Sequence, residues 1–172
     1  MNKLTEKAQE ALVAAQNLAQ EMNHSAIEAE HLLTALLEQS DGVVPQIVSG
    51  AGVNAESLGA LVRDELKKLA RAYGPVQVGL SPKLSRVLDN AQNIANNLKD
   101  EYVSTEHFLI ALAESDTPAG RILNRTGITR DKILQTLTQI RGNQRVTSQN
   151  PETTYQALQK YGRDLTDAAR KG

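Results

Sequence analysis

The strongest constraint on the fold is an internal repeat. When the chain is aligned with itself at a shift of 76 residues, residues 4–38 match residues 80–114 without a gap, and 13 of these 35 positions are identical. Farther along the chain the match continues at a shift of 75 residues, which aligns Val62 with Leu137, for example. A duplication of this length indicates two structurally equivalent units. We place copy one at 1–70 and copy two at 80–140.

Apolar residues in both copies recur at helical spacing. Intervals of three and four residues place them on one face of a helix, as in Leu4, Ala8, Ala11, Leu12, Ala15, Leu18, Ala19 and Met22. The same reading gives four helices in each copy. The predicted fold class is all-α, a pseudo-twofold duplicated four-helix repeat with eight helices that forms one domain over residues 1–140.

Polar residues mark the expected helix starts. Thr5 and Ser81 stand at equivalent positions before the first helix of each copy, where a side-chain oxygen can accept a backbone N–H. Pro82 follows Ser81, at a position where a missing N–H does no harm. Asn54 and Thr129 are equivalent candidates before the fourth helices. These signals support the same helix boundaries in both copies.

The end of the chain differs in character. Residues 141–151 contain a single apolar residue, Val146, and this composition predicts a flexible linker. Residues 152–172 carry a short amphipathic pattern whose apolar face has no partner within the double repeat. We interpret 152–172 as the lead-in to a further domain.

Composition excludes several functions. The formal net charge is −1, so no global field attracts nucleic acid or an anionic membrane. Residues 1–70 hold ten acidic against five basic residues, which favours partners with basic segments. With no cysteine, the chain has neither disulfides nor thiol catalysis. No signal peptide or long apolar run is present, and we expect a cytoplasmic protein.

Sequence motifs for catalysis are also missing. The chain contains no G-x-x-x-x-G-K-[ST], no G-x-S-x-G and no H-E-x-x-H. We therefore predict that this chain is not an enzyme, with no catalytic residue and no cofactor of its own.

The duplicated Glu-His pairs, Glu30-His31 and Glu106-His107, allow one alternative. Two histidines and two glutamates across a pseudo-twofold axis could bind a divalent metal. However, adjacent helix residues diverge by about 100°, so we favour a structural role in which each histidine packs inward against a backbone group. His24 has no histidine at its equivalent position and is expected at the surface.

Two motifs resemble a known family. L-T-x-K-A-Q-x-A-L at residues 4–12 and E-H-L-L-x-A-L-L at residues 30–37 are similar to the Clp N-terminal repeat, and residues 104–112 carry the T-E-H form of the second motif. Asn150-Pro151 and the segment 155–166 resemble the linker and lead-in to the first ATPase module of the ClpB type. The resemblance to the repeat covers about residues 1–140.

The resemblance implies a substrate-binding module of a larger protein. The parent would be a homohexameric AAA+ disaggregase that needs ATP and magnesium, works with an Hsp70-type system in heat stress and acts on unfolded or aggregated polypeptides. The isolated domain would be a monomer. In this family, substrate recognition is attributed to a groove between the repeats, and the matching positions here are Thr5, Glu30, Ser81, Asp100, Tyr102 and Glu106.

Two other functions remain open at this stage. The same surface could dock a folded adaptor and so regulate a Clp ATPase. The chain could also be a stand-alone metal-dependent helical enzyme built on the Glu-His pairs. A single stoichiometric folded partner would favour the first, and bound metal in the purified protein would favour the second.

Overall fold

The structure is a computed structural model that describes residues 3–72, 78–142 and 145–151. Its described helices follow the repeat. Copy one contains α1 (Glu6–Glu21), α2 (Ala29–Glu38), α3 (Val43–Gly50) and α4 (Ala55–Lys67). Copy two contains α5 (Pro82–Asn97), α6 (Thr105–Glu114), α7 (Pro118–Arg125) and α8 (Arg130–Arg141). The all-α class and the duplicated four-helix arrangement are confirmed.

The helices begin at the predicted caps. The Thr5 hydroxyl accepts the Ala8 N–H at 3.1 Å, and the Ser81 hydroxyl accepts the Leu84 N–H at the same distance. Asn54 and Thr129 cap α4 and α8 in the same way. Each cap satisfies a backbone donor that the helix itself leaves unpaired.

Four two-residue strands, which the sequence did not predict, join the copies. They are β1 (Lys3–Leu4), β2 (Ala26–Ile27), β3 (Gly79–Leu80) and β4 (Tyr102–Val103). β1 pairs in parallel with β4, and β2 pairs in parallel with β3. Leu4 lies opposite Val103, and Leu80 lies opposite Ile27. Leu80 is the repeat equivalent of Leu4 and Val103 that of Ile27, so the repeat turns one strand pair into the other. This exchange is the pseudo-twofold relation that the sequence predicted.

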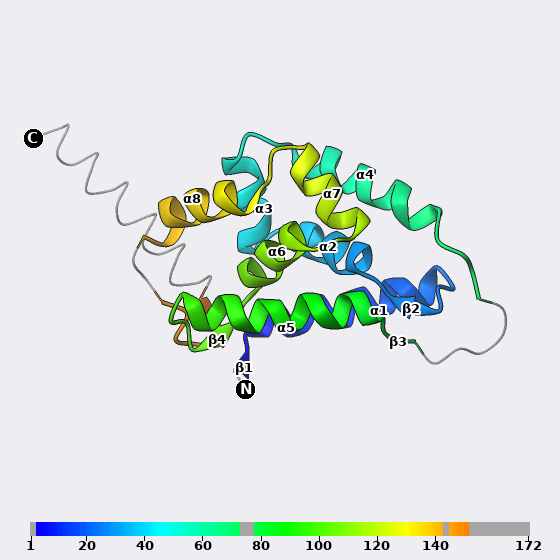
Figure 1. Ribbon diagram of the computed structural model, residues 1–172, viewed down its shortest axis with the longest axis horizontal. Coiled ribbons are helices and arrows are strands. Elements are labelled where there is room, and N and C mark those ends of the chain that lie inside the picture. Colours follow the sequence, from blue (N-terminus) through cyan, green and yellow to red (C-terminus); the bar gives the residue numbers. More distant parts are fainter. Residues whose placement is uncertain (1–2, 73–77, 143–144, 152–172) are drawn as a thin grey trace, which may run out of the picture.

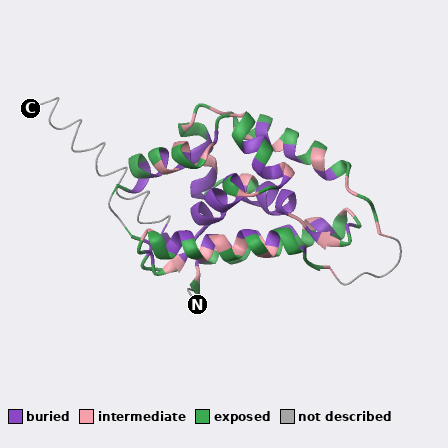
Figure 2. Cartoon of the chain, viewed as in Figure 1, coloured by how far each residue is buried: buried purple, intermediate pink, exposed green. Residues whose placement is uncertain are grey.

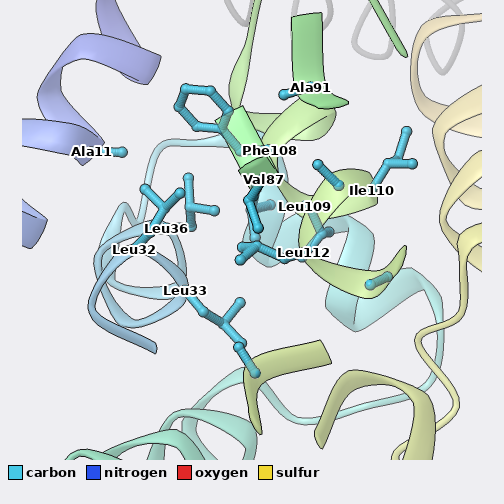
Figure 3. Packing of buried hydrophobic residues seen from close by; sticks show 14 of the residues in the cluster. Ala11, Leu32, Leu33, Leu36, Val87, Ala91, Phe108, Leu109, Ile110 and Leu112 are labelled. Atoms are coloured by element: carbon cyan, nitrogen blue, oxygen red, sulfur yellow. The ribbon is translucent and has the colours of Figure 1, made fainter. Parts of the chain in front are cut away.

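The centre of the molecule is built from α2 and α6. Figure 1 shows them between the long helices α1 and α5 and the group formed by α3, α4, α7 and α8, and Figure 2 shows that they are buried along almost their whole length. Large side chains of α2 and α6 fill the core between the layers, as the close view in Figure 3 shows. The fully buried ones include Leu32, Leu33, Leu36, Phe108, Leu109, Ile110 and Leu112.

The copies share this core. α2 packs against α7 and α5 of the other copy as well as against α1 and α4 of its own. α6 likewise contacts α1 and α3 of copy one. On α1 the interior positions Ala8, Ala11, Ala15 and Ala19 are fully buried, and these small residues allow close helix packing.

The segment after α8 corrects the predicted flexible linker. Arg141 belongs to α8 and is buried, and Val146 is fully buried. The Val146 carbonyl accepts the N–H groups of Glu101 and Tyr102, and the Gln149 carbonyl accepts the N–H of Glu6. The polar composition hid this packing because the segment is held mainly through its backbone, which any residue supplies. Residues 152–172, the predicted lead-in, lie outside the described residues.

A pair of glycine substitutions tests the packing. A Cβ on Gly120 would lie 2.4 Å from the Ser115 carbonyl oxygen, whereas a Cβ on Gly59 meets nothing within 4 Å. We expect Gly120→Ala to lower the free energy of unfolding by about 1–3 kcal/mol through overpacking. Gly59→Ala should raise it by about 0.5–1 kcal/mol because alanine is the better helix former. Urea denaturation measures both, and equal effects would contradict this packing.

Candidate functional site

Thr5 and Ser81, the first two predicted substrate contacts, are buried structural residues. Besides capping α1 and α5, each donates its backbone N–H across to the other copy. Thr5 bonds to the Val103 carbonyl and Ser81 to the Ile27 carbonyl, both at 3.0 Å. The two residues are 0% and 5% exposed, and their backbone hydrogen bonds help to hold the copies together.

Glu30 and Glu106 lie in the first turns of α2 and α6 and are also buried. Glu30 Oε2 and both carboxylate oxygens of Glu106 have no hydrogen-bond partner among the described residues. Burial raises the pKa of both carboxyls above the ordinary value. Arg141 Nη1 lies 3.9 Å from Glu106 Oε2 and partly offsets this effect.

Asp100 is the centre of a buried polar cluster. Its Oδ2 accepts hydrogen bonds from His107 Nε2 at 2.7 Å and Arg141 Nη2 at 3.0 Å, and its Oδ1 accepts the Val146 N–H at 2.9 Å. Burial opposes ionisation of Asp100, but the hydrogen bonds from His107 and Val146 and the charge of Arg141 hold its pKa below the ordinary value. The cluster fastens α8 and the segment after it to the start of β4.

Copy one builds the same place from different residues. His24 replaces Asp100 and is 3% exposed, so the expectation that His24 lies at the surface is wrong. Its Nδ1 faces His31 Nε2 at 2.7 Å, and the fully buried Leu66 stands where copy two has Arg141. Burial lowers the pKa of His24 and lowers that of His31 to about 4, with His24 adding to the second effect.

The two repeat-equivalent histidines, His31 and His107, use both ring nitrogens within the protein. His31 Nδ1 accepts the Glu28 N–H and His107 Nδ1 accepts the Ser104 N–H, each at 2.8 Å. Their Nε2 atoms face His24 and Asp100. The structural role predicted for these histidines is thus what the geometry shows. Across residues 3–72, 78–142 and 145–151, no group of three or more His, Asp or Glu residues is arranged to hold a metal.

Tyr102 alone among the six predicted contacts is partly exposed. It lies in β4 opposite Lys3, beside the start of α1. The other five are buried, and none of the six lines the four surface cavities described next. The substrate groove that the family resemblance implies at these residues stays a prediction.

Open surfaces occur on the long helices and between helices. A shallow depression of about 480 Å³ follows one face of α1, lined by Glu6, Gln9, Glu10, Val13, Ala14 and Asn17. A second, also about 480 Å³, lies between α4 and α7 of the two copies and includes Glu65, Arg121 and Arg125. A cavity of about 410 Å³ lies between α2 and α4, and one of about 370 Å³ lies between α5, α6 and the loop 115–117. Val13 is 56% exposed. It does not belong to the apolar stripe predicted for the first helix, and an apolar residue off that stripe was the one sign in the sequence of an exposed apolar surface on α1.

Comparison with known proteins decides the family. The sequence profile of the Clp repeat N-terminal domain matches residues 3–126. The chain belongs to this family. It is 46% identical to the chaperone protein ClpB of Nitratidesulfovibrio vulgaris over 178 aligned positions, which cover all of this chain but 21% of that protein. The chain thus spans about a fifth of the length of the curated relatives it matches.

Solved structures agree with the Clp repeat assignment. The N-terminal domain of Hsp104 from Candida albicans matches with a TM-score of 0.78 and 25% identity, over 87% of this chain and 99% of that one. A ClpV N-domain solved in complex with a VipB peptide has the same fold, with a TM-score of 0.64 and 20% identity over 79% and 85% of the two chains. The ClpB relatives and the Hsp104 structure confirm the resemblance to ClpB-type N-domains, and the ClpV structure agrees in fold. No described helix of this Clp repeat domain has the length and apolar character to cross a membrane.

The raised pKa of Glu106 gives the stability a pH dependence. Above the ordinary value of 4.5 the folded state retains a proton that the unfolded state has lost, so stability falls as pH rises through that window. Each pH unit corresponds to about 1.4 kcal/mol at most. We expect Glu106→Gln, which cannot ionise, to gain stability relative to the parent chain between pH 4.5 and 7. A urea-denaturation difference that does not change with pH would contradict this.

The difference between the two polar clusters suggests a substitution that gives copy one the aspartate of copy two. His24→Asp places in copy one the carboxylate that copy two has at Asp100. A negative charge beside His31 favours its protonated form, so the pKa of His31 should rise well above about 4. NMR titration of the imidazole protons measures this directly. His107, in the other copy, is the internal control, and an unchanged His31 titration would overturn the prediction.

Proposed function

We propose that this chain is the N-terminal polypeptide-binding domain of a ClpB-type chaperone that disaggregates proteins in an ATP-dependent manner. The observation that carries the proposal is the match to ClpB proteins along the whole chain, at 46% identity to one of them. The chain contains no P-loop motif, so its own contribution is binding and not ATP hydrolysis. Its clients would be unfolded or aggregated polypeptides that accumulate in heat stress.

The whole protein supplies the remaining functions in this proposal. ATP and magnesium would bind in its ATPase modules, and no cofactor would bind in this chain. The parent would be a cytoplasmic homohexamer that cooperates with an Hsp70-type system, and the isolated domain would be a monomer. Neither nucleic acid nor membrane would be a partner, in line with the formal net charge of −1.

The exposed face of α1 has the character that client capture requires. Val13 and Ala14 form an apolar strip, and Glu6 and Glu10 provide carboxylates at its edge. An unfolded segment that covers Val13 removes apolar surface from water, which favours binding. The carboxylates favour segments that carry basic residues. Because a flexible client loses conformational freedom on binding, we expect affinities of micromolar order or weaker.

The six residues predicted from the family pattern enter this proposal in two ways. We propose Tyr102 as a client contact because it is partly exposed and pairs with Lys3 just before α1. Thr5, Ser81, Glu30, Asp100 and Glu106 are buried, and we propose that they position the strand pairs and helix starts around the binding face. The ClpV N-domain in complex with a VipB peptide shows that a domain of this fold can bind a peptide.

Substitution of Val13 tests the client-binding face. We expect Val13→Ser to weaken binding of an unfolded protein such as reduced casein by about fivefold, since the loss of one exposed apolar contact costs about 1 kcal/mol. Leu61→Ser is the matched control, because Leu61 is 44% exposed on α4, away from the α1 depression. NMR titration gives the affinities and the shifted residues. Equal loss in both variants, or no shifts near Val13 and Tyr102, would contradict the assignment.

The same two variants, used in a pull-down, separate client capture from adaptor docking. A pull-down with the isolated domain that recovers one folded protein in stoichiometric amount would favour an adaptor-docking module. Recovery of many unfolded proteins, lost in Val13→Ser and retained in Leu61→Ser, would favour client capture.

A further inference from the structure

The two copies differ at one corner in a way that leaves a charged cavity in copy two. The corner lies where the first helix of each copy faces the loop between the second and third helices. In copy one this loop spans residues 39–42, between α2 and α3, and in copy two it spans residues 115–117, between α6 and α7. The loop of copy two is thus one residue shorter, and this difference changes the repeat shift from 76 to 75.

Copy one closes its corner with its own side chains. The Gln39 amide donates to the Lys7 carbonyl at 2.9 Å, and the Lys7 ammonium donates to Asp41 Oδ2 at 2.7 Å. Glu10 Oε2 lies 3.5 Å from the same ammonium. Lys7 is therefore paired with two carboxylates, one of which comes from the longer loop.

The shorter loop of copy two is held by hydrogen bonds to α6 and α7, and it faces α5 across a cavity. The Ser115 hydroxyl donates to the Leu112 carbonyl at 2.6 Å and lies 2.8 Å from the Thr117 hydroxyl, which accepts the Gly120 N–H. Asp116, the loop carboxylate, pairs with Arg121 at 3.2 Å. Among the described residues, no carboxylate of this loop forms an ion pair with Lys83, in contrast to the Asp41–Lys7 pair of copy one.

The corner that remains is a cavity of about 370 Å³ with cationic residues on one side. It is lined by Lys83, Arg86, Val87, Asn90, Ala111, Ser115, Asp116 and Thr117. Lys83 is the repeat equivalent of Lys7, and Arg86 replaces Glu10, so copy two exchanges an acidic residue for a second basic one. The buried side chains of Val87 and Ala111 supply an apolar floor.

Neither cation has a carboxylate partner in the described part of the chain. Within the described residues Lys83 and Arg86 form no ion pair, and both are exposed. The buried Glu30 carboxylate interacts with Lys83 electrostatically but lies too far away for an ion pair. The cavity volume is at the lower end of the range of ligand sites, about 300–1,000 Å³.

We propose that this corner binds a carboxylate side chain of an acidic polypeptide segment. The Asp41–Lys7 pair in copy one is the internal template for this contact. An aspartate or glutamate of the ligand would lie between Lys83 and Arg86, and a small neighbouring side chain would cover Val87 and Ala111. The proposal goes beyond the client-binding face on α1, since the two surfaces lie on different helices and carry opposite charge.

The test uses the full 172-residue chain and two synthetic peptides. One is N-acetyl-Gly-Ala-Glu-Ala-Glu-Ala-Gly-amide, and the other has glutamine at both glutamate positions. We expect the glutamate peptide to shift the amide resonances of Arg86, Ala111 and Ser115, and the glutamine peptide to bind about fivefold more weakly or not at all. Binding should also weaken between 0.05 M and 0.5 M salt because these charges are exposed.

Arg86→Glu places in copy two the residue that copy one has at Glu10, and it should abolish binding of the glutamate peptide. Lys67→Glu is the control, an exposed lysine of α4 that does not line the cavity. Equal binding of the two peptides, or equal loss of binding in the two variants, would overturn the proposal. It would also be overturned if free glutamate displaced the glutamate peptide when both are present at the same concentration. Val13→Ser should leave this binding unchanged, so the outcome is independent of the client-binding face.

Discussion

The burial of α2 and α6 between helices of both copies supports the rest of the structure. Each of these helices is almost entirely enclosed, and each contacts helices that belong to the other copy. A single copy would therefore leave the apolar faces of its central helix in water, at a large cost in free energy. The paired strands add backbone hydrogen bonds between the copies at both ends. We infer that the duplicated halves fold as one unit and not as two small domains.

With the backbone fixed in this way, equivalent corners can carry different chemistry. His31 and His107 make the same hydrogen bond to the backbone before their helices, but one faces a histidine and the other an aspartate. The aspartate brings Arg141 and Val146 into a buried network that ties the segment after α8 to the domain. Copy one has the apolar, fully buried Leu66 at the place of Arg141.

The same divergence separates the candidate binding surfaces. On α1 the exposed face combines Val13 with the carboxylates of Glu6 and Glu10. On α5 the repeat-equivalent positions of the loop corner carry Lys83 and Arg86. Under the proposed function, faces of opposite charge on the two long helices would suit chemically varied clients, because no single charge pattern is shared by unfolded segments.

The sequence by itself determined the class of fold and much of its detail. Helix periodicity, the caps at Thr5, Ser81, Asn54 and Thr129, and the repeat depend on residues close together in the chain, and each is local information. The family motifs could also be recognised from the order of the residues alone. The inward packing of His31 and His107 was also predicted, although the angle between adjacent helix positions did not indicate that Glu30 and Glu106 beside them are buried as well.

The tertiary structure decided which of the polar residues lie inside. Glu30, Asp100, Glu106 and His24 are charged or polar in type, and nothing local in the sequence shows that partners distant in the chain, such as Arg141 and Val146 for Asp100, enclose them. The strand pairs and the anchored 145–151 segment were missed for the same reason. They depend on backbone groups brought together by the closure of the two copies, and every residue type carries those groups.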